Sequence, residues 1–110
     1  MATTYKVLGQ AAPADTNNAD LYTVPAATQA VVSTINVANV TASAATFSIY
    51  VRVAGAAAGN GNAIAKDVTL AANSIYSATQ GITLGATDVV TVQSGTADAL
   101  TFSMFGSEVA

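Results

Sequence analysis

Apolar and polar side chains alternate along much of this chain. The stretch TFSIYVRV shows the pattern best: Phe47, Ile49, Val51 and Val53 fall on one side, and Thr46, Ser48, Tyr50 and Arg52 fall on the other. Successive side chains of a β-strand point to opposite faces, so this period of two predicts a half-buried strand over residues 46–53.

Similar short segments recur, with turn signals about every ten residues. The expected strands cover residues 4–8, 21–24, 30–39, 46–53, 64–70, 74–79, 89–94 and 99–106, with a further short strand within 81–88. No window has apolar residues at helical spacing. The pattern predicts an all-β fold: a single small antiparallel β-sandwich, jelly-roll or immunoglobulin-like, or a compact barrel, of about eight or nine short strands. Residues 1–110 have the length of one domain.

Two antiparallel pairs follow from proximity along the chain. The strands at 30–39 and 46–53 are long, adjacent and rich in β-branched residues, so we expect them to pair. The strand at 89–94 is expected to pair across the short GTAD segment with 99–106.

The side of strand 30–39 that carries Val31, Ser33, Ile35 and Val37 is the better candidate for the core. Near the start of the chain, residues 9–20 (GQAAPADTNNAD) are predicted to form a loop or a flexible arm. Residues 54–63 (AGAAAGNGNA) are predicted to be an exposed connection.

Charge is sparse in this sequence. Only 8% of residues are charged and the net charge is −3, whereas charged residues make up about 25% of an ordinary soluble domain. The three basic residues, Lys6, Arg52 and Lys66, are far apart along the chain, which argues against a nucleic-acid partner. A surface of Thr, Ser, Asn and Gln fits a subunit of a crowded assembly better than a free monomer.

Neither a membrane span nor a secretory signal is expected. Residues 21–51 carry no charge, but Thr, Ser, Asn, Gln and Pro25 interrupt them, and a spanning helix needs about 20 mostly apolar residues in a row. The opening MATTYKVLGQ lacks a basic segment followed by an apolar run.

The residues that usually carry catalysis or hold metals are missing. There is no His and no Cys, which removes the usual general base, thiolate chemistry and the preferred ligands of zinc and copper. We therefore expect no enzyme activity, no cofactor, no metal and no small-molecule substrate, and we assign no catalytic residue.

The acidic residues are expected to shape turns, because each lies in or beside a predicted turn, where Asp normally caps or bends the backbone. They are Asp15, Asp20, Asp67, Asp88, Asp98 and Glu108. The segment DTNNAD lacks the glycine and terminal Glu of a calcium loop, and GNGN lacks the Lys-Ser/Thr of a phosphate loop.

Two further groups of residues have a structural and a binding interpretation. Lys66 and Asp67 are most simply a solvated pair on an edge strand. Tyr22, Tyr50 and Tyr76 either lie half buried at a sheet rim or form a binding face for sugar or protein.

Six segments together resemble a family of small virion structural proteins of tailed bacteriophages, of the marine-phage and cyanophage type. The segments are YKVLGQ, LYTVPA, VVSTINVAN, TFSIYVRVAG, GITLGATDVVTV and LTFSMFGSE, and they span nearly the whole chain. The chain departs from the family pattern chiefly at AGAAAGNGNA.

The resemblance implies a non-enzymatic subunit of the virion. For a chain of this length it implies a capsid decoration, or cement, protein on the capsid exterior, made in the cytoplasm of the bacterial host. The expected partners are the major capsid protein and further copies of the chain, as a trimer or a dimer. Two alternatives stay open: a tail, neck or tail-fibre-associated protein, and a carbohydrate-binding β-module.

Overall fold

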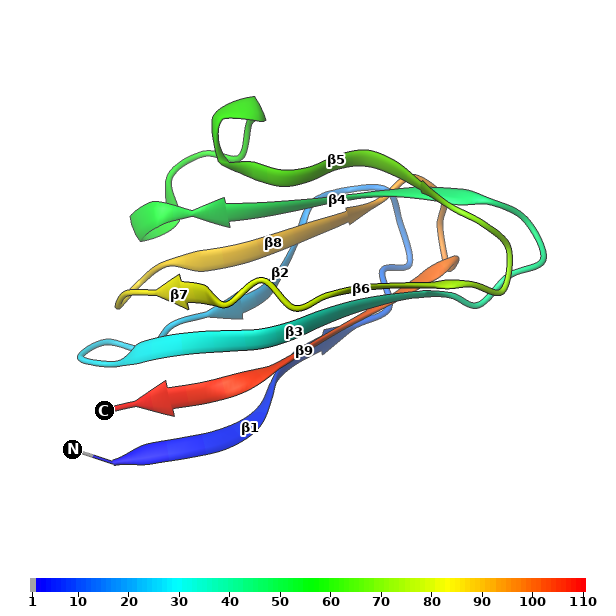
Figure 1. Ribbon diagram of the computed structural model, residues 1–110. Helices are drawn as coiled ribbons and strands as arrows, with labels where there is room; N and C mark the ends of the chain where they lie inside the picture. Colours follow the sequence, from blue (N-terminus) through cyan, green and yellow to red (C-terminus); the bar gives the residue numbers. More distant parts are fainter. Residues whose placement is uncertain (1) are drawn as a thin grey trace.

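The strands form two antiparallel sheets that pack face to face, as the alternating pattern predicted. The computed structural model describes residues 2–110. The strands are β1 (Thr3–Ala11), β2 (Ala19–Thr23), β3 (Gln29–Asn39), β4 (Ala45–Arg52), β5 (Ala63–Leu70), β6 (Ile75–Ala78), β7 (Ile82–Leu84), β8 (Val89–Ser94) and β9 (Leu100–Val109). Figure 1 shows the two layers, with β2, β8, β4 and β5 in one and the remaining strands in the other.

The strand order is that of a jelly roll. Sheet A has the order β1-β9-β3-β6, with β7 also paired to β3, and sheet B has the order β2-β8-β4-β5. Because β6 and β7 pair with the two halves of β3, they act as one interrupted edge strand. The chain changes sheet at every connection except β4–β5 and β6–β7, which is the double Greek-key arrangement of a jelly roll.

Both strand pairs expected from chain proximity are wrong. The strand β3 pairs with β9, β6 and β7, whereas β4 pairs with β5 and β8. Likewise β8 and β9 lie in different sheets. The physical reason is that the connections 40–44 and 95–98 cross the sandwich, so that the apolar sides of consecutive strands meet in the core instead of lying side by side in one sheet.

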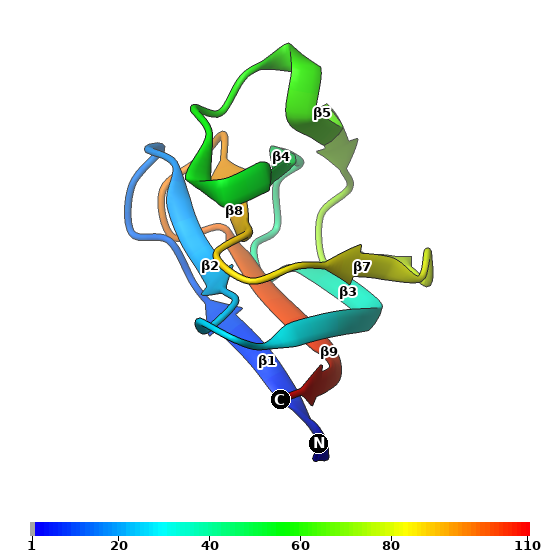
Figure 2. The same cartoon turned by 90° about the vertical axis from the view of Figure 1, so that its left-hand side faces the viewer.

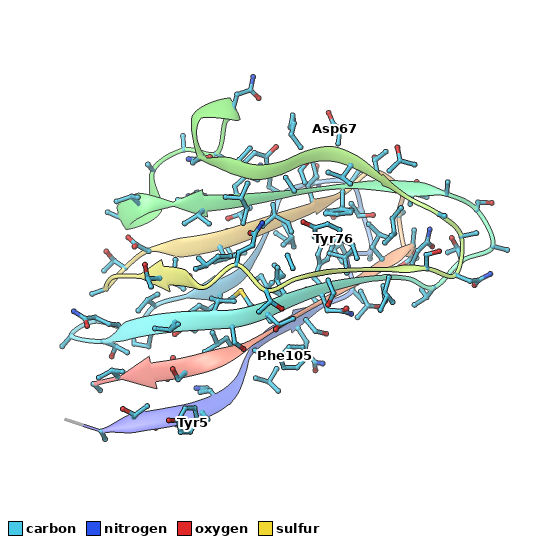
Figure 3. The ribbon with its side chains drawn as sticks, in the orientation of Figure 1. Tyr5, Asp67, Tyr76 and Phe105 are labelled. Carbon is cyan, nitrogen blue, oxygen red and sulfur yellow. The ribbon has the colours of Figure 1, made fainter. Side chains whose placement is uncertain are left out.

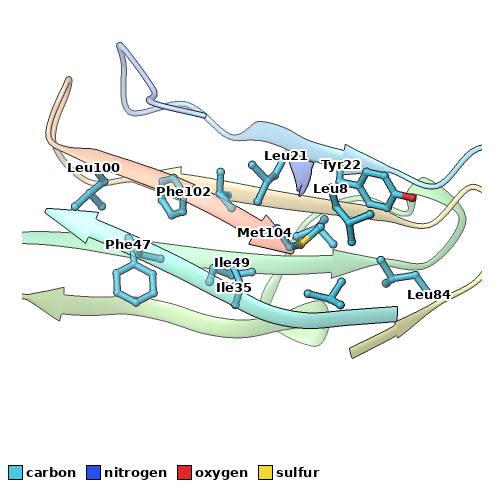
Figure 4. Packing of buried hydrophobic residues seen from close by; sticks show 14 of the residues in the cluster. Leu8, Leu21, Tyr22, Ile35, Phe47, Ile49, Leu84, Leu100, Phe102 and Met104 are labelled. Carbon is cyan, nitrogen blue, oxygen red and sulfur yellow. The ribbon is translucent and has the colours of Figure 1, made fainter. Parts of the chain in front are cut away.

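The core consists of apolar side chains from both sheets (Figure 4). The ring of Phe47 on β4 lies 5.0 Å from the Tyr76 ring and 6.5 Å from the Phe102 ring between centroids. Leu100, Phe102 and Met104 on β9 are almost fully buried, in agreement with their alternation in the sequence. Offset and edge-on aromatic contacts of this kind hold the two sheets at a fixed spacing.

The predicted inner face of β3 is half wrong. Ile35 and Val37 are buried as expected, but Val31 is exposed and Val32 is buried in its place. A β-bulge interrupts the pairing with β9 between Val32 and Thr34. Since a bulge adds one residue to one strand, it reverses the side that every earlier residue faces.

The loop predicted over residues 9–20 is shorter, because β1 continues to Ala11 and β2 begins at Ala19. The remaining segment 12–18 is tied to the body of the protein at two points: Asp98 donates its backbone N–H to the Pro13 carbonyl at 3.1 Å, and Gln93 Nε2 donates to the Thr16 carbonyl at 2.9 Å. The connection between β4 and β5 contains two short 3-10 turns, Val53–Gly55 and Asn60–Asn62, neither with a buried residue, as the prediction for 54–63 requires.

The two ends of the chain meet at one end of the sandwich (Figure 2). Ala2 and Ala110 exchange two backbone hydrogen bonds, at 2.9 and 3.0 Å. This extends the β1–β9 pairing to the ends of both strands.

Candidate interaction surface

The two outer faces of the sandwich differ in chemistry. In Figure 3, Tyr5 and Phe105 lie on the outer side of sheet A, Asp67 lies on the opposite side of the molecule at sheet B, and Tyr76 lies between the layers. Pairing register and burial show which of the remaining strand residues point outward from sheet A and which point into the core.

The outer face of sheet A, here named the uncharged face, has no charged side chain among the residues that the structure describes. It consists of Thr3, Tyr5, Val7, Gln10, Gln29, Val31, Ser33, Thr34, Asn36, Ala38, Ile75, Ser77, Thr83, Thr101, Ser103, Phe105, Ser107 and Val109. Lys6 and Glu108 belong to the flanking strands β1 and β9 but face the other way, because they alternate with Tyr5, Val7, Phe105 and Ser107.

Four exposed apolar side chains gather at one end of the uncharged face. Val7, which is 49% exposed, pairs directly with Phe105, which is 37% exposed. In the adjacent row Ser107 lies between Tyr5 and Val31, which are 83% and 41% exposed. Single exposed apolar residues are normal on a soluble protein, whereas a contiguous group makes this end of the uncharged face the candidate contact surface.

Several polar side chains of the uncharged face form hydrogen bonds within the chain. Ser77 Oγ donates to Asn36 Oδ1 at 3.2 Å, and Gln10 Nε2 donates to Ser103 Oγ at 3.3 Å. The Thr34 and Thr79 hydroxyl oxygens lie 3.3 Å apart, and Ser33 Oγ donates to the Phe105 carbonyl at 3.2 Å. A partner covering this face therefore need not replace many bonds to water.

The outer face of sheet B, here named the charged face, is organised around Arg52. Its guanidinium donates to Asp20 Oδ1 at 3.0 Å and to Thr91 Oγ1 at 3.1 Å. It also donates to the carbonyls of Gly55 and Ala56, at 2.9 and 2.7 Å. Arg52 thus joins β2, β4 and β8 to the connection after β4, and its donors are committed within the chain.

A second charged group lies on the edge strand β5. Lys66 Nζ donates to the Tyr50 hydroxyl at 3.2 Å and lies 3.9 Å from Asp67 Oδ2. The Tyr50 hydroxyl, followed by the Asp67 carboxylate, raises the pKa of Lys66. The pair is exposed and on an edge, as expected from the sequence.

Glu108 links the two sheets at the end where the termini meet. Its carboxylate accepts a short hydrogen bond from the Tyr22 hydroxyl on β2 and a bond of 3.3 Å from Lys6 Nζ on β1. The Tyr22 hydroxyl, with a smaller effect from Lys6, lowers the pKa of Glu108, although desolvation opposes the shift. Burial and the Glu108 carboxylate raise the pKa of Tyr22 above its ordinary value.

A shallow polar hollow of about 280 Å³ lies beside the charged face. Its lining includes Thr16, Ser48, Asp67 and Gln93. These groups offer hydroxyl, amide and carboxylate oxygens but no exposed aromatic platform, since Phe47 in the same lining is buried.

The prediction that every acid lies in or beside a turn holds only in part. Asp67 lies inside β5, where its φ of 48° marks a bulge, and Glu108 lies inside β9. Asp88 does cap turns: its carboxylate accepts from the backbone N–H groups of Ala54 and Gly85, at 2.9 and 2.8 Å.

The three tyrosines singled out in the sequence do not form a common surface. Tyr22 and Tyr50 are buried, and Tyr76 packs on Phe47 between the sheets. The exposed aromatic residues are Tyr5 and Phe105, which sequence reasoning missed. The available signal was that Phe105 is a large aromatic residue on the polar side of its strand, beside Thr101 and Ser103.

Within residues 2–110 there is no group of three or more acidic, His or Cys side chains placed to hold a metal ion. In the same range, none of the helices has the length and apolar character needed to cross a bilayer. The chain matches no protein-family model, no curated protein sequence and no solved structure.

Proposed function

We propose that this chain is a non-enzymatic structural subunit of a bacteriophage virion, specifically a decoration protein on the outside of the head. It would contact neighbouring major capsid subunits and further copies of itself. The observation that carries the proposal is the uncharged face: four strand positions wide, with Tyr5, Val7, Val31 and Phe105 exposed on it. The resemblance of the segments from YKVLGQ to LTFSMFGSE supports the choice of a virion.

The chemistry of this surface suits a protein that works through buried contact area. Ser, Thr, Ala and Val side chains lose little rotamer entropy when a partner covers them. A decoration subunit that touches several neighbours gains further, because once one contact is made the others act at high effective concentration. Many small interfaces then resist the outward pressure of packed DNA.

A tail, neck or fibre-associated role is the second candidate and would use the same surface chemistry. A carbohydrate-binding module is less well supported, because sugar rings stack on exposed aromatic side chains, and the polar hollow at Ser48, Asp67 and Gln93 has none.

The direct test is immunogold electron microscopy of intact virions of the phage that encodes this chain, with an antibody raised against the purified protein. We expect gold over the whole head. Gold confined to the tail or its fibres would replace the decoration role with the second candidate. Absence of gold from particles, with the protein abundant in the lysate, would overturn the virion proposal.

Two controls make the labelling specific. Preincubating the antibody with purified protein should remove the gold. Particles treated with protease should lose the label if the protein lies outside the shell, and their packed DNA should stay protected.

A further inference from the structure

We propose that the uncharged face binds a second copy of this chain, so that two sandwiches pack face to face through their A sheets in a two-fold dimer. This inference rests on the proposed role as an assembly subunit and names the surface and the partner. Of the two oligomers expected from the sequence, a trimer or a dimer, it selects the dimer.

The distribution of charge favours a second copy as the occupant. The net charge is −3, so two copies repel wherever their carboxylates approach. Asp20 and Asp67 lie on the charged face, and Glu108 points between the sheets. Across the uncharged face two copies meet without opposing or desolvating any charge, which is the condition for an isologous contact between like-charged chains.

The hydrogen bonds within the uncharged face reduce the free-energy cost of burying the polar groups that form them. Asn36 with Ser77, and Gln10 with Ser103, remain paired when water is excluded. Burial by an identical partner leaves the bonds within these two pairs in place. The contact gains from Tyr5, Val7, Val31 and Phe105, which a monomer leaves in water.

The size of the face is adequate for a stable dimer. Four strand positions about 4.8 Å apart, each about ten residues long, give roughly 650 Å² on each copy. The total of roughly 1,300 Å² falls at the lower end of specific protein interfaces, which bury about 1,200–2,000 Å².

Two of the four sheet edges, β1 and β5, are poor alternatives for self-association. Lys6 lies on the edge strand β1 and Lys66 on the edge strand β5, and pairing of either strand with its own copy would bring lysines together. Bulges also interrupt β1 between Val7 and Gly9 and β5 opposite Phe47 and Ile49. Lysines and bulges on edge strands oppose strand addition, so these two edges are poorer contacts than the uncharged face.

The test is sedimentation equilibrium of the purified full chain across the micromolar range. The wild-type chain should sediment with twice the mass of one copy. Phe105→Lys and Tyr5→Lys should each raise the dimer dissociation constant about a hundredfold, because the substitution places two like charges in a dry contact.

Val40→Lys is the matched control. Val40 is 62% exposed in the β3–β4 turn, outside the uncharged face, so this variant should remain a dimer. Circular dichroism checks that each variant folds. If Phe105→Lys does not fold, Tyr5→Lys decides, because a side chain that is 83% exposed contributes little to the core.

The outcomes separate this inference from the proposed function. A monomeric or trimeric wild-type chain, or a dimer that both face variants leave intact, overturns the inference whatever the virions show. A dimer that the face variants break supports it, even if immunogold finds no label on particles and the virion proposal fails. If the wild-type chain is monomeric and Phe105→Lys abolishes binding to purified heads, the face belongs to the shell instead.

Discussion

The outer faces of the two sheets differ in how their polar and charged side chains are used. Both cover one side of a shared core, yet the outer face of sheet B carries Arg52 with a carboxylate, a hydroxyl and two backbone carbonyls as its partners, whereas that of sheet A carries no charged side chain among the described residues. On the charged face, polar side chains hold the connections between strands against the sheet. On the uncharged face, several polar side chains form hydrogen bonds with neighbouring residues, and Tyr5 and Phe105 are exposed to water.

From this difference we expect the charged face to contribute mainly to the stability of the fold and the uncharged face mainly to association with a partner. On the charged face each ionic contact has a partner within the chain, so removing one should destabilise the fold. On the uncharged face the exposed apolar side chains contact little of their own chain, so changing them should alter association more than folding. The following predictions test this division, beginning with the largest effect on stability.

Gly106→Ala should destabilise sheet A strongly. A Cβ at this position would overlap the Val31 carbonyl oxygen and lie 3.0 Å from Val32 Cα, both backbone atoms of β3. Since neither can move without disturbing the bulge that sets the uncharged face, we expect a loss of about 3 kcal/mol in the free energy of unfolding. Urea denaturation followed by circular dichroism measures it.

The control for this substitution is Gly61→Ala, where a Cβ meets nothing within 4 Å. It should change the free energy of unfolding by no more than about 0.5 kcal/mol. Equal effects of the two substitutions would mean that close approach of β9 and β3 does not limit the packing of sheet A.

Arg52→Met should lower the free energy of unfolding by about 2 kcal/mol, because it keeps the aliphatic stem but removes the donor to two backbone carbonyls and the cationic partner of Asp20. The Asp20 carboxylate keeps its hydrogen bond from the Thr91 hydroxyl. Lys6→Met is the counterpart on sheet A. It removes a single ion pair whose lysine is 45% exposed, and the expected loss is below about 1 kcal/mol. Thermal denaturation of both variants measures the two losses of stability. Equal losses would mean that Arg52, whose donors are bonded within the chain, contributes no more to stability than the partly exposed Lys6.

Glu108→Gln should have the smallest effect at neutral pH and change the response to acid. The Tyr22 hydroxyl holds the folded pKa of Glu108 below its ordinary value of 4.5. A lowered folded pKa contributes stability that is present above the unfolded pKa and is lost as the pH falls through the folded pKa. The melting temperature of the wild-type chain should therefore fall more steeply on acidification below about pH 5 than that of the variant, and parallel curves would contradict the assignment.

The sequence predicted the positions of the strands better than the pairing between them. The period of two located the strands, and Leu100, Phe102 and Met104, which alternate with more polar positions in the sequence, lie buried on one side of β9. The period of two did not reveal the bulge at Val32–Thr34. A bulge changes which side chains of a strand point to the core without changing the amino-acid composition of the strand. The predicted β3–β4 and β8–β9 pairs are wrong, because strands that are consecutive in the chain were expected to be neighbours in one sheet. In this sandwich the connections between them cross from one sheet to the other.

The sequence predicted the candidate surface only through the low charge content of the whole chain. The low charge content predicted a surface suited to assembly, but not that one whole face would lack charge. Lys6 and Glu108 lie within the strands of that face, and only their registers and the Tyr22–Glu108 bond show that both point away from it.

The sequence by itself determined that the chain is all-β, that its strands bury one side, and that it lacks the residues of common catalytic and metal sites. These follow from local periodicity and residue chemistry, which depend on near neighbours along the chain. The tertiary structure decided the jelly-roll order, the segregation of charge onto one outer face and the exposure of Tyr5 and Phe105. Those properties depend on pairing between residues as distant as Thr3 and Val109, and no local pattern carries information about contacts at that separation.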